Sequence, residues 1–251
     1  SVNPRLGREL EFDRPEMNGN GRQMVVVGGG VAGMQAAGVL ARRGFKVTLF
    51  EADSKLGGAL DLAAKNVDKD HLLWLIETMA YELEKLGVDV RLNTKATVDS
   101  VKALNPDGVF VCCGGTHIEP QIPGVDLPKA IRVKDYLEGR AQPGKKVAVI
   151  GSGATGLETA ASLAMRGHDV TVIEMLPKVG SGIIERVLRV ILARLERLGV
   201  KLMPGHKLTA INEKGVKLER VEDGSELELE FDSVILALGI RPQREYACEF
   251  A

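Results

Sequence analysis

The feature that most constrains this chain is an internal repeat, because a buried strand running into a glycine-rich turn occurs twice. Residues 25–33 (VVVGGGVAG) recur as residues 148–156 (AVIGSGATG), an offset of 123 positions from 28 to 151. Residues 47–51 likewise match residues 170–174, and the acid that closes each stretch follows the first glycine by 23 positions in both copies. A duplicated unit fixes the architecture before any local prediction is made.

Each copy has the pattern of a βαβ unit: an apolar strand, an amphipathic helix and a second strand. We expect the helices over residues 31–43 and 154–166. Right-handed crossovers then make each sheet parallel. A second helix is expected in each copy, over residues 71–86 and 184–198, with glycines as C-terminal stops.

Further strands complete the prediction. Residues 107–114 parallel residues 232–239, which adds a strand to each sheet. The polar, alternating region from 207 to 231 predicts an antiparallel meander laid across a parallel sheet. In the helix expected over residues 71–86, Trp74 and the apolar residues around it are expected in the core. The fold class is therefore α/β, with two Rossmann-like dinucleotide-binding domains, each a parallel sheet with helices and an added β-meander.

The glycine-rich turns indicate pyrophosphate binding. A helix N-terminus offers unpaired N–H groups and partial positive charge, and glycines let phosphates approach the backbone. The acid that closes the second strand can accept hydrogen bonds from ribose hydroxyls. Glu174 also favours NADH over NADPH, because a carboxylate repels a 2′-phosphate and no Arg lies beside it in the sequence. The alternative, a tight turn without a ligand, is disfavoured because the whole set of residues is repeated.

With these two glycine-rich turns and their acids, the chain resembles the two-dinucleotide flavoprotein superfamily, in which an FAD-type domain carries an inserted NAD(P)H-type domain. Lys55-Leu56-Gly57-Gly58 is similar to the turn that passes beneath the flavin, and Glu158 matches the GxGxxGxE pattern of the pyridine-nucleotide half. The stretches at 112–114 and 237–239 resemble the second short motif, normally Ala-Thr-Gly. The motifs and the resemblance together give these cofactor-binding candidates: Gly28, Gly30, Val31, Ala32, Gly33, Glu51, Ala52, Gly58, Cys113, Gly114, Gly151, Gly153, Ala154, Thr155, Gly156, Glu158, Glu174 and Gly239.

A closer resemblance is to the C-terminal region of the NADH:flavin oxidoreductases, which include 2,4-dienoyl-CoA reductase, enoate reductases and trimethylamine dehydrogenase. Residues 2–9, 56–60, 92–94 and 172–176 carry it. It implies hydride transfer from NADH to FAD, and electron passage through an iron-sulfur cluster to FMN in an N-terminal barrel that this chain lacks. No catalytic side chain and no metal ligand are expected here, because the cofactors carry the chemistry.

Turn signals at residues 120–128 and 239–242, together with the resemblance, indicate the domain boundaries. Residues 1–126 are expected to form the FAD-binding-type domain with an N-terminal arm, and residues 127–242 the inserted NAD(P)H-binding-type domain. Residues 243–251 begin the return into the FAD domain, which is truncated. The family's closing Gly-Asp segment is expected beyond residue 251, which argues against firm FAD retention by this chain alone. Cys113 replaces the motif's threonine, and its thiol is a weaker hydrogen-bond donor.

Composition narrows the class of partner. With 33 Lys+Arg against 34 Asp+Glu, the net charge of −1 offers no long-range attraction to nucleic acid or an anionic membrane. Small nucleotides, and the parent's own FMN barrel, are the expected partners. Three cysteines without a disulfide or zinc spacing favour a reducing, cytoplasmic setting. The beginning, Ser1-Val2-Asn3-Pro4, indicates a fragment of a longer chain.

A second function stays open from the sequence alone. One or both sites could hold an adenine nucleotide such as ADP for structural reasons, without redox turnover. Intact glycines and acids in both copies favour the enzyme, whereas the expected loss of the closing segment favours the structural alternative.

Overall fold

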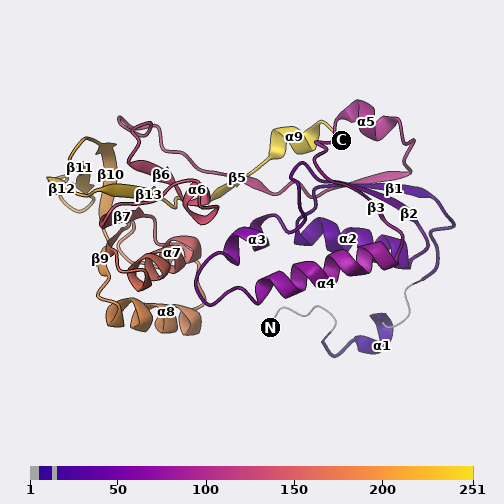
Figure 1. Ribbon diagram of the computed structural model, residues 1–251, viewed down its shortest axis with the longest axis horizontal. Helices are drawn as coiled ribbons and strands as arrows, with labels where there is room; N and C mark the ends of the chain where they lie inside the picture. Colours follow the sequence, from indigo (N-terminus) through magenta and orange to yellow (C-terminus); the bar gives the residue numbers. More distant parts are fainter. Residues whose placement is uncertain (1–5, 13–15, 251) are drawn as a thin grey trace. The chain divides into compact units, whose positions relative to one another are not determined.

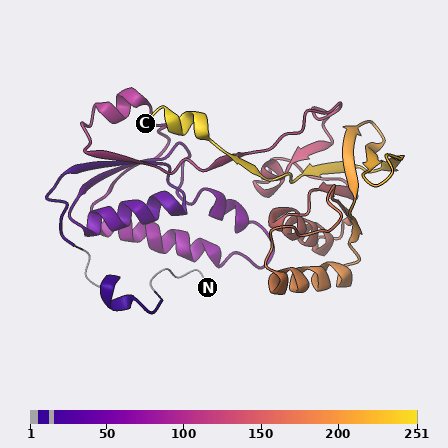
Figure 2. The same cartoon turned by 180° about the vertical axis from the view of Figure 1, so that it is seen from behind.

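A computed structural model describes residues 6–12 and 16–250 of the chain, so the Val2–Pro4 part of the resemblance lies outside the described residues. Its contacts divide into two compact units (Figures 1 and 2). Unit 1 runs to Asp61 and resumes over His71–Gly114 and from Gln243 onward, whereas unit 2 comprises Leu62–Asp70 and Gly115–Pro242. The sequence division at 126/127 and 242/243 stays a prediction.

Unit 1 is built on a four-stranded parallel sheet in the order β3-β2-β1-β4. On one face of this sheet, Val26 and Leu49 of the strands pack with Met34 and Leu83 of the helices. On the other face, a second cluster of buried residues includes Val25 and Phe50. The strands are β1 (Gln23–Val27), β2 (Lys46–Phe50), β3 (Asp89–Arg91) and β4 (Gly108–Val111), and the helices are α1 (Glu9–Phe12), α2 (Val31–Arg42), α4 (Leu72–Lys85), α5 (Val98–Lys102) and α9 (Arg244–Cys248). A short helix, α3 (Ala59–Ala63), begins in unit 1 and ends in unit 2.

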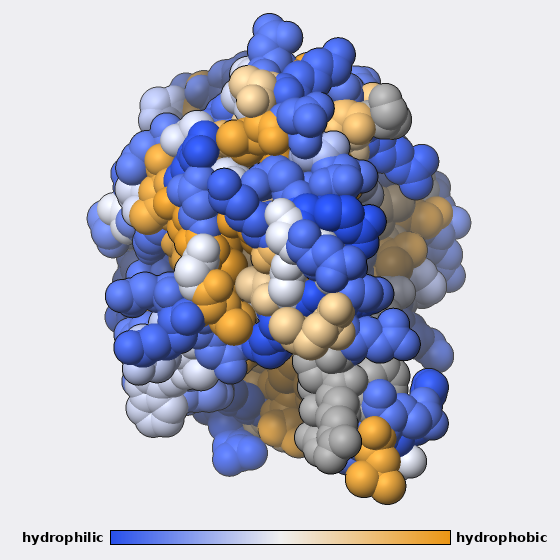
Figure 3. Space-filling model, turned by 90° about the vertical axis from the view of Figure 1, so that its right-hand side faces the viewer, coloured by the Kyte–Doolittle hydropathy of each residue, from blue (hydrophilic) through white to orange (hydrophobic). Residues whose placement is uncertain are grey.

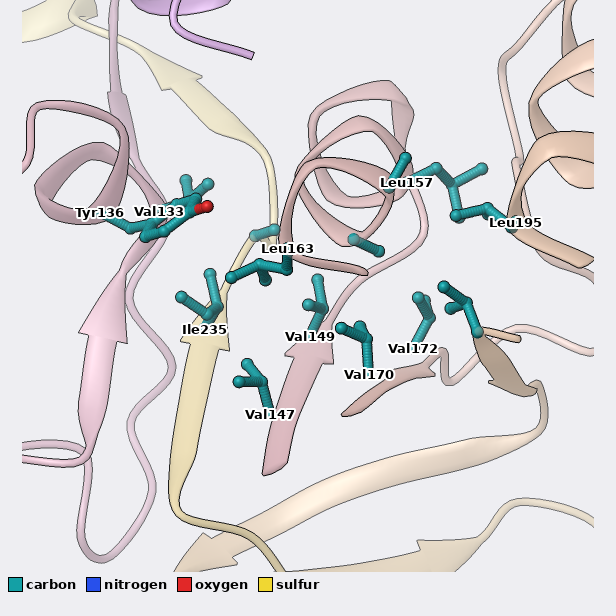
Figure 4. Close-up of a cluster of buried hydrophobic side chains, with 14 of the residues drawn as sticks. Val133, Tyr136, Val147, Val149, Leu157, Leu163, Val170, Val172, Leu195 and Ile235 are labelled. Carbon is teal, nitrogen blue, oxygen red and sulfur yellow. The ribbon is translucent and has the colours of Figure 1, made fainter. Parts of the chain in front are cut away.

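Unit 2 repeats this order with an added edge strand, as β9-β8-β7-β13-β6, also parallel. Figure 4 shows its core, in which Val149, Val172 and Ile235 of the sheet face Leu157 and Leu163. The strands are β6 (Ala130–Arg132), β7 (Lys146–Ile150), β8 (Asp169–Ile173), β9 (Lys201–Met203) and β13 (Ser233–Leu236), and the helices are α6 (Val133–Leu137), α7 (Ala154–Met165) and α8 (Glu185–Arg197). The duplicated Rossmann-type α/β fold is therefore confirmed.

The predicted meander is present in unit 2. It consists of β10 (His206–Ile211), β11 (Gly215–Arg220) and β12 (Glu226–Glu230), paired antiparallel. Val216 and Leu218 pack with Ile150 and Ile173, so the meander covers the sheet face opposite the helices. Two further strands, β5 (Gly115–His117) and β14 (Ile240–Pro242), pair with each other beside the unit boundaries.

Two predictions about unit 1 were wrong. Among its described residues no meander joins the sheet: the segment before β4 forms α5 instead, because Thr97 and Ser100 make reciprocal capping hydrogen bonds that start a helix. Trp74 is 69% exposed rather than in the core. The buried face of α4 passes through Ile76, Met79 and Leu83, and Trp74 lies off that face at 3.6 residues per turn.

Figure 3 shows one face on which hydrophilic side chains are interspersed with smaller hydrophobic areas. No helix in the described part of the chain is long and apolar enough to cross a membrane.

Candidate functional site

The first glycine-rich turn forms a backbone cradle between β1 and α2. Gly28 has φ of +106°, a conformation that side chains with a Cβ rarely adopt. A Cβ at Gly33 would overlap the Gly28 carbonyl oxygen, so this glycine lets helix and strand pack closely. At Gly30, by contrast, a Cβ would meet no atom within 4 Å. The open position is the one at which a phosphate could approach the backbone.

The second turn, between β7 and α7, repeats this geometry. Gly151 has φ of +100°, and a Cβ at Gly156 would overlap the Gly151 carbonyl oxygen. The space at Gly153 is open within 4 Å. Both units therefore hold the same cradle, with two glycines required by the fold and one that leaves free space.

The helices that start at the cradles are suited to bind anions. Gly30 and Gly153 are the N-caps of α2 and α7, both extended in conformation and both without a side-chain cap. Their first turns, which include Val31 and Ala32 or Ala154 and Thr155, contain no acidic residue. Each helix has 12 residues, long enough for its dipole to favour negative charge at this end.

The two acids lie beside the cradles, as the spacing predicts. The Glu51 carboxylate accepts the Gly29 N–H at 2.6 Å and the Asp53 N–H at 2.7 Å. The Glu174 carboxylate accepts the Ser152 N–H and the Leu176 N–H, each at 2.9 Å. Glu51 is half-buried, whereas Glu174 is 8% exposed. Each carboxylate has lone pairs beyond these bonds that can accept a ribose hydroxyl.

The Leu-Gly-Gly turn packs against the first cradle. The Gly57 N–H donates to the Gly29 carbonyl at 2.9 Å, and a Cβ at Gly58 would lie 3.2 Å from the Gly30 Cα. The turn therefore closes one side of the first cradle. Ala52, between Glu51 and this turn, is exposed.

The second short motif lies against the first glycine of each cradle. Within unit 1, a Cβ at Gly28 would overlap the Cys112 carbonyl oxygen, and Cys113 and Gly114 follow directly. The Gln243 side chain donates to the Cys113 carbonyl at 3.0 Å, while the Cys113 thiol lies 3.9 Å from the Gln243 carbonyl. In unit 2, Gly239 has φ of +95°, and its carbonyl accepts the Ile118 N–H.

Glu158 is placed differently from the other candidates. It lies on α7 and forms an ion pair with Lys69, beside a small cavity that Asn66, Ser162 and Arg194 also line. All of these residues belong to unit 2. The structure therefore gives Glu158 a cationic partner within the unit, which the sequence did not indicate.

Sequence reasoning missed three residues of this region. Ser152 and Gly180 take part in the hydrogen bonding around Glu174, and Gln243 holds the Cys113 carbonyl. The one available signal was that Ser152 stands where the first copy has Gly29.

The cysteine thiols and the acidic and histidine side chains in the described part of the chain are further potential reactive groups or metal ligands. Burial, and then the neighbouring Cys113, raise the pKa of the Cys112 thiol. In the described residues no group of three His, Cys, Asp or Glu side chains is placed to hold a metal ion.

Comparison with known proteins identifies what this arrangement resembles. Residues 22–251 match the protein family described as pyridine nucleotide-disulphide oxidoreductase. A bilirubin reductase of Mediterraneibacter gnavus is 36% identical over 221 residues, which cover 88% of this chain and 34% of that protein. An NADH oxidase of Thermoanaerobacter brockii is 34% identical over 247 residues, which cover 96% of this chain and 38% of that protein.

Solved structures agree with these matches. A 2-naphthoyl-CoA reductase in complex with 2-naphthoyl-CoA is 30% identical and superposes with a TM-score of 0.90, covering 100% of this chain and 38% of that one. The chain thus spans well under half the length of each of these three proteins.

Proposed function

Because the chain belongs to the pyridine nucleotide-disulphide oxidoreductase family, we propose that it is the electron-entry module of a longer enzyme, in which hydride passes from NADH to FAD. The observation that supports this most is the pair of matching cradles, each with open space at one glycine and an acid beside it. The NADH oxidase and reductase names of the relatives support the same class of reaction.

We assign FAD to unit 1 and NADH to unit 2. The FAD site takes Gly28, Gly30, Val31, Ala32, Gly33, Glu51, Ala52, Gly58, Cys113 and Gly114, and the NADH site takes Gly151, Gly153, Ala154, Thr155, Gly156, Glu158, Glu174 and Gly239. The hydride chemistry belongs to the bound cofactors. The chain's own residues bind pyrophosphate at the N-termini of α2 and α7 and orient the riboses through Glu51 and Glu174.

The remaining parts of the proposal concern the parent enzyme. The greater length of the relatives supports a parent with an N-terminal barrel carrying FMN and an iron-sulfur cluster, as the sequence resemblance implies. We propose a reductase of the enoate or 2,4-dienoyl-CoA type. The three cysteines are all free, which supports a cytoplasmic location.

Spectroscopy of the 251-residue chain tests the proposal. The chain is saturated with FAD and titrated anaerobically with NADH while free FAD remains in the solution, because this chain alone is not expected to retain FAD firmly. We expect a bound flavin whose absorption band bleaches on addition of NADH. A colourless protein that takes up no FAD and releases ADP on denaturation would instead support the structural adenine-nucleotide function.

A further inference from the structure

The two cradles differ at the residue between their first two glycines. In unit 1 this residue is Gly29, whose N–H alone reaches the acid, Glu51. In unit 2 it is Ser152, which donates both its N–H and its hydroxyl to the same Glu174 oxygen, at 2.9 and 2.8 Å. Ser152 is 1% exposed, so its hydroxyl depends on protein partners rather than water.

The side chains around Gly29 explain why unit 1 has a glycine where unit 2 has Ser152. A Cβ at Gly29 would lie 2.5 Å from the Leu56 Cδ2 and 2.9 Å from a Glu51 carboxylate oxygen, so a serine there requires the neighbours to move. Unit 2 has room for the side chain. The serine therefore gives the second acid a hydrogen bond that the first acid lacks.

The Ser152 hydroxyl also holds the segment that follows β8. It accepts the Gly180 N–H at 3.0 Å, 28 positions along the chain. Gly180 is buried, with φ of +77°, and a Cβ there would overlap the Leu188 side chain of α8. One hydroxyl thus joins the glycine turn, the acid and the segment from 175 to 184.

We propose that Ser152 is a positioning residue that sets the preference of unit 2 for NADH through Glu174. The proposal rests on the NADH site proposed above. With one oxygen held by Ser152 and the other by the Leu176 N–H, the carboxylate has a fixed orientation, and its remaining lone pairs can accept the 2′-hydroxyl of NADH. NADPH carries a phosphate at that position, which a fixed carboxylate repels and which cannot use this hydrogen bond.

Direct binding of NADH and of NADPH to the full chain, measured by calorimetry, tests the inference. In Ser152→Ala we expect the Kd for NADH to rise about tenfold, the lower end of the range for one hydrogen bond to a charged group. The Kd for NADPH should change less than about twofold, because NADPH does not use the Glu174 acceptor. The ratio of the two affinities therefore falls about tenfold.

Two comparisons separate positioning from a general structural role. The exposed Ser181→Ala, in the same segment, should leave both Kd values unchanged. In a Glu174→Ala background, Ser152→Ala should produce no further loss of NADH affinity, since the serine acts through the acid. If Ser152→Ala does not fold, as judged by its circular dichroism melt, Ser152→Cys replaces it, because a thiol is similar in shape and a weak donor.

The outcomes distinguish the two proposals. If the unmodified chain binds no NADH, the proposed function and this inference both fail. If the unmodified chain binds NADH and Ser152→Ala binds it equally well, only the role of Ser152 is overturned. Equal losses of NADH and NADPH affinity would also overturn it, because they would show a structural effect.

Discussion

At the scale of residues, the two acids have unequal surroundings although the sequence spaces them identically. Glu51 is half-buried with two backbone donors, whereas Glu174 is buried and receives three hydrogen bonds. A buried carboxylate with a fixed orientation discriminates better between a hydroxyl and a phosphate than a mobile one does. The preference between NADH and NADPH should therefore depend on Glu174. Glu51, which we assign to the FAD site, should not affect it.

Replacing Glu174 with Gln tests that assignment. The amide keeps the size of the side chain and removes the charge, so we expect the Kd for NADH to rise about tenfold, in the range for a charged hydrogen bond. The Kd for NADPH should fall, because the repulsion of the 2′-phosphate is lost. Glu51→Gln is the matched control, and an equal change of the NADH/NADPH ratio in both variants would contradict the assignment.

The cysteines should differ in reactivity because the thiolate is the nucleophile. Burial and the adjacent Cys113 raise the pKa of Cys112, whereas Cys248 is exposed. At pH 8 we expect iodoacetamide to alkylate Cys248 well before Cys112, as followed by peptide mass spectrometry. Faster modification of Cys112 would show that its thiol is more accessible or more ionised than the structure indicates.

At the scale of elements, the meander covers the sheet face that the helices leave open. Leu218 of β11 is fully buried against that face, whereas Leu227 of the neighbouring β12 is 36% exposed. The meander therefore stabilises unit 2 through its buried side chains.

Leu218→Ala should destabilise the chain by about 2–5 kcal/mol, the usual cost of a buried Leu→Ala substitution. Leu227→Ala, in the same meander, should cost less than about 1 kcal/mol because its side chain is partly in water. Urea unfolding followed by circular dichroism measures both. Equal losses in the two variants would contradict the packing described for this sheet face.

Elements also show how far the sequence could predict the structure. The helices from Val31 and Ala154 and the parallel strands were predictable, since each depends on local periodicity and on the repeat. The meander of unit 2 was predictable from its alternating pattern, but the repeat wrongly extended it to unit 1. Trp74 was predicted in the core together with the apolar residues around it, but it lies off the buried face of α4. The hydrogen bonds of the Ser152 hydroxyl could not be predicted from the sequence, because its second partner, Gly180, lies 28 residues away along the chain.

At the scale of the whole molecule, the chain carries the same α/β unit twice, and each copy ends its central strand in the same cradle. The glycines required by the fold and the glycines that leave open space are distinct positions. A substitution at Gly30 or Gly153, the glycines with open space, should therefore abolish binding of one nucleotide and leave the fold unchanged. Each nucleotide site can therefore be tested separately, by a substitution at its own open glycine.

The stoichiometry of adenine-nucleotide binding tests this account most directly. Gly30→Val and Gly153→Val place a branched side chain in open space, at extended backbone angles that valine tolerates, so both variants should fold. With ADP as the probe in calorimetry, we predict two molecules bound per unmodified chain and one per chain in each variant. Retention of both molecules in either variant, or loss of both in one, would contradict two independent cradles.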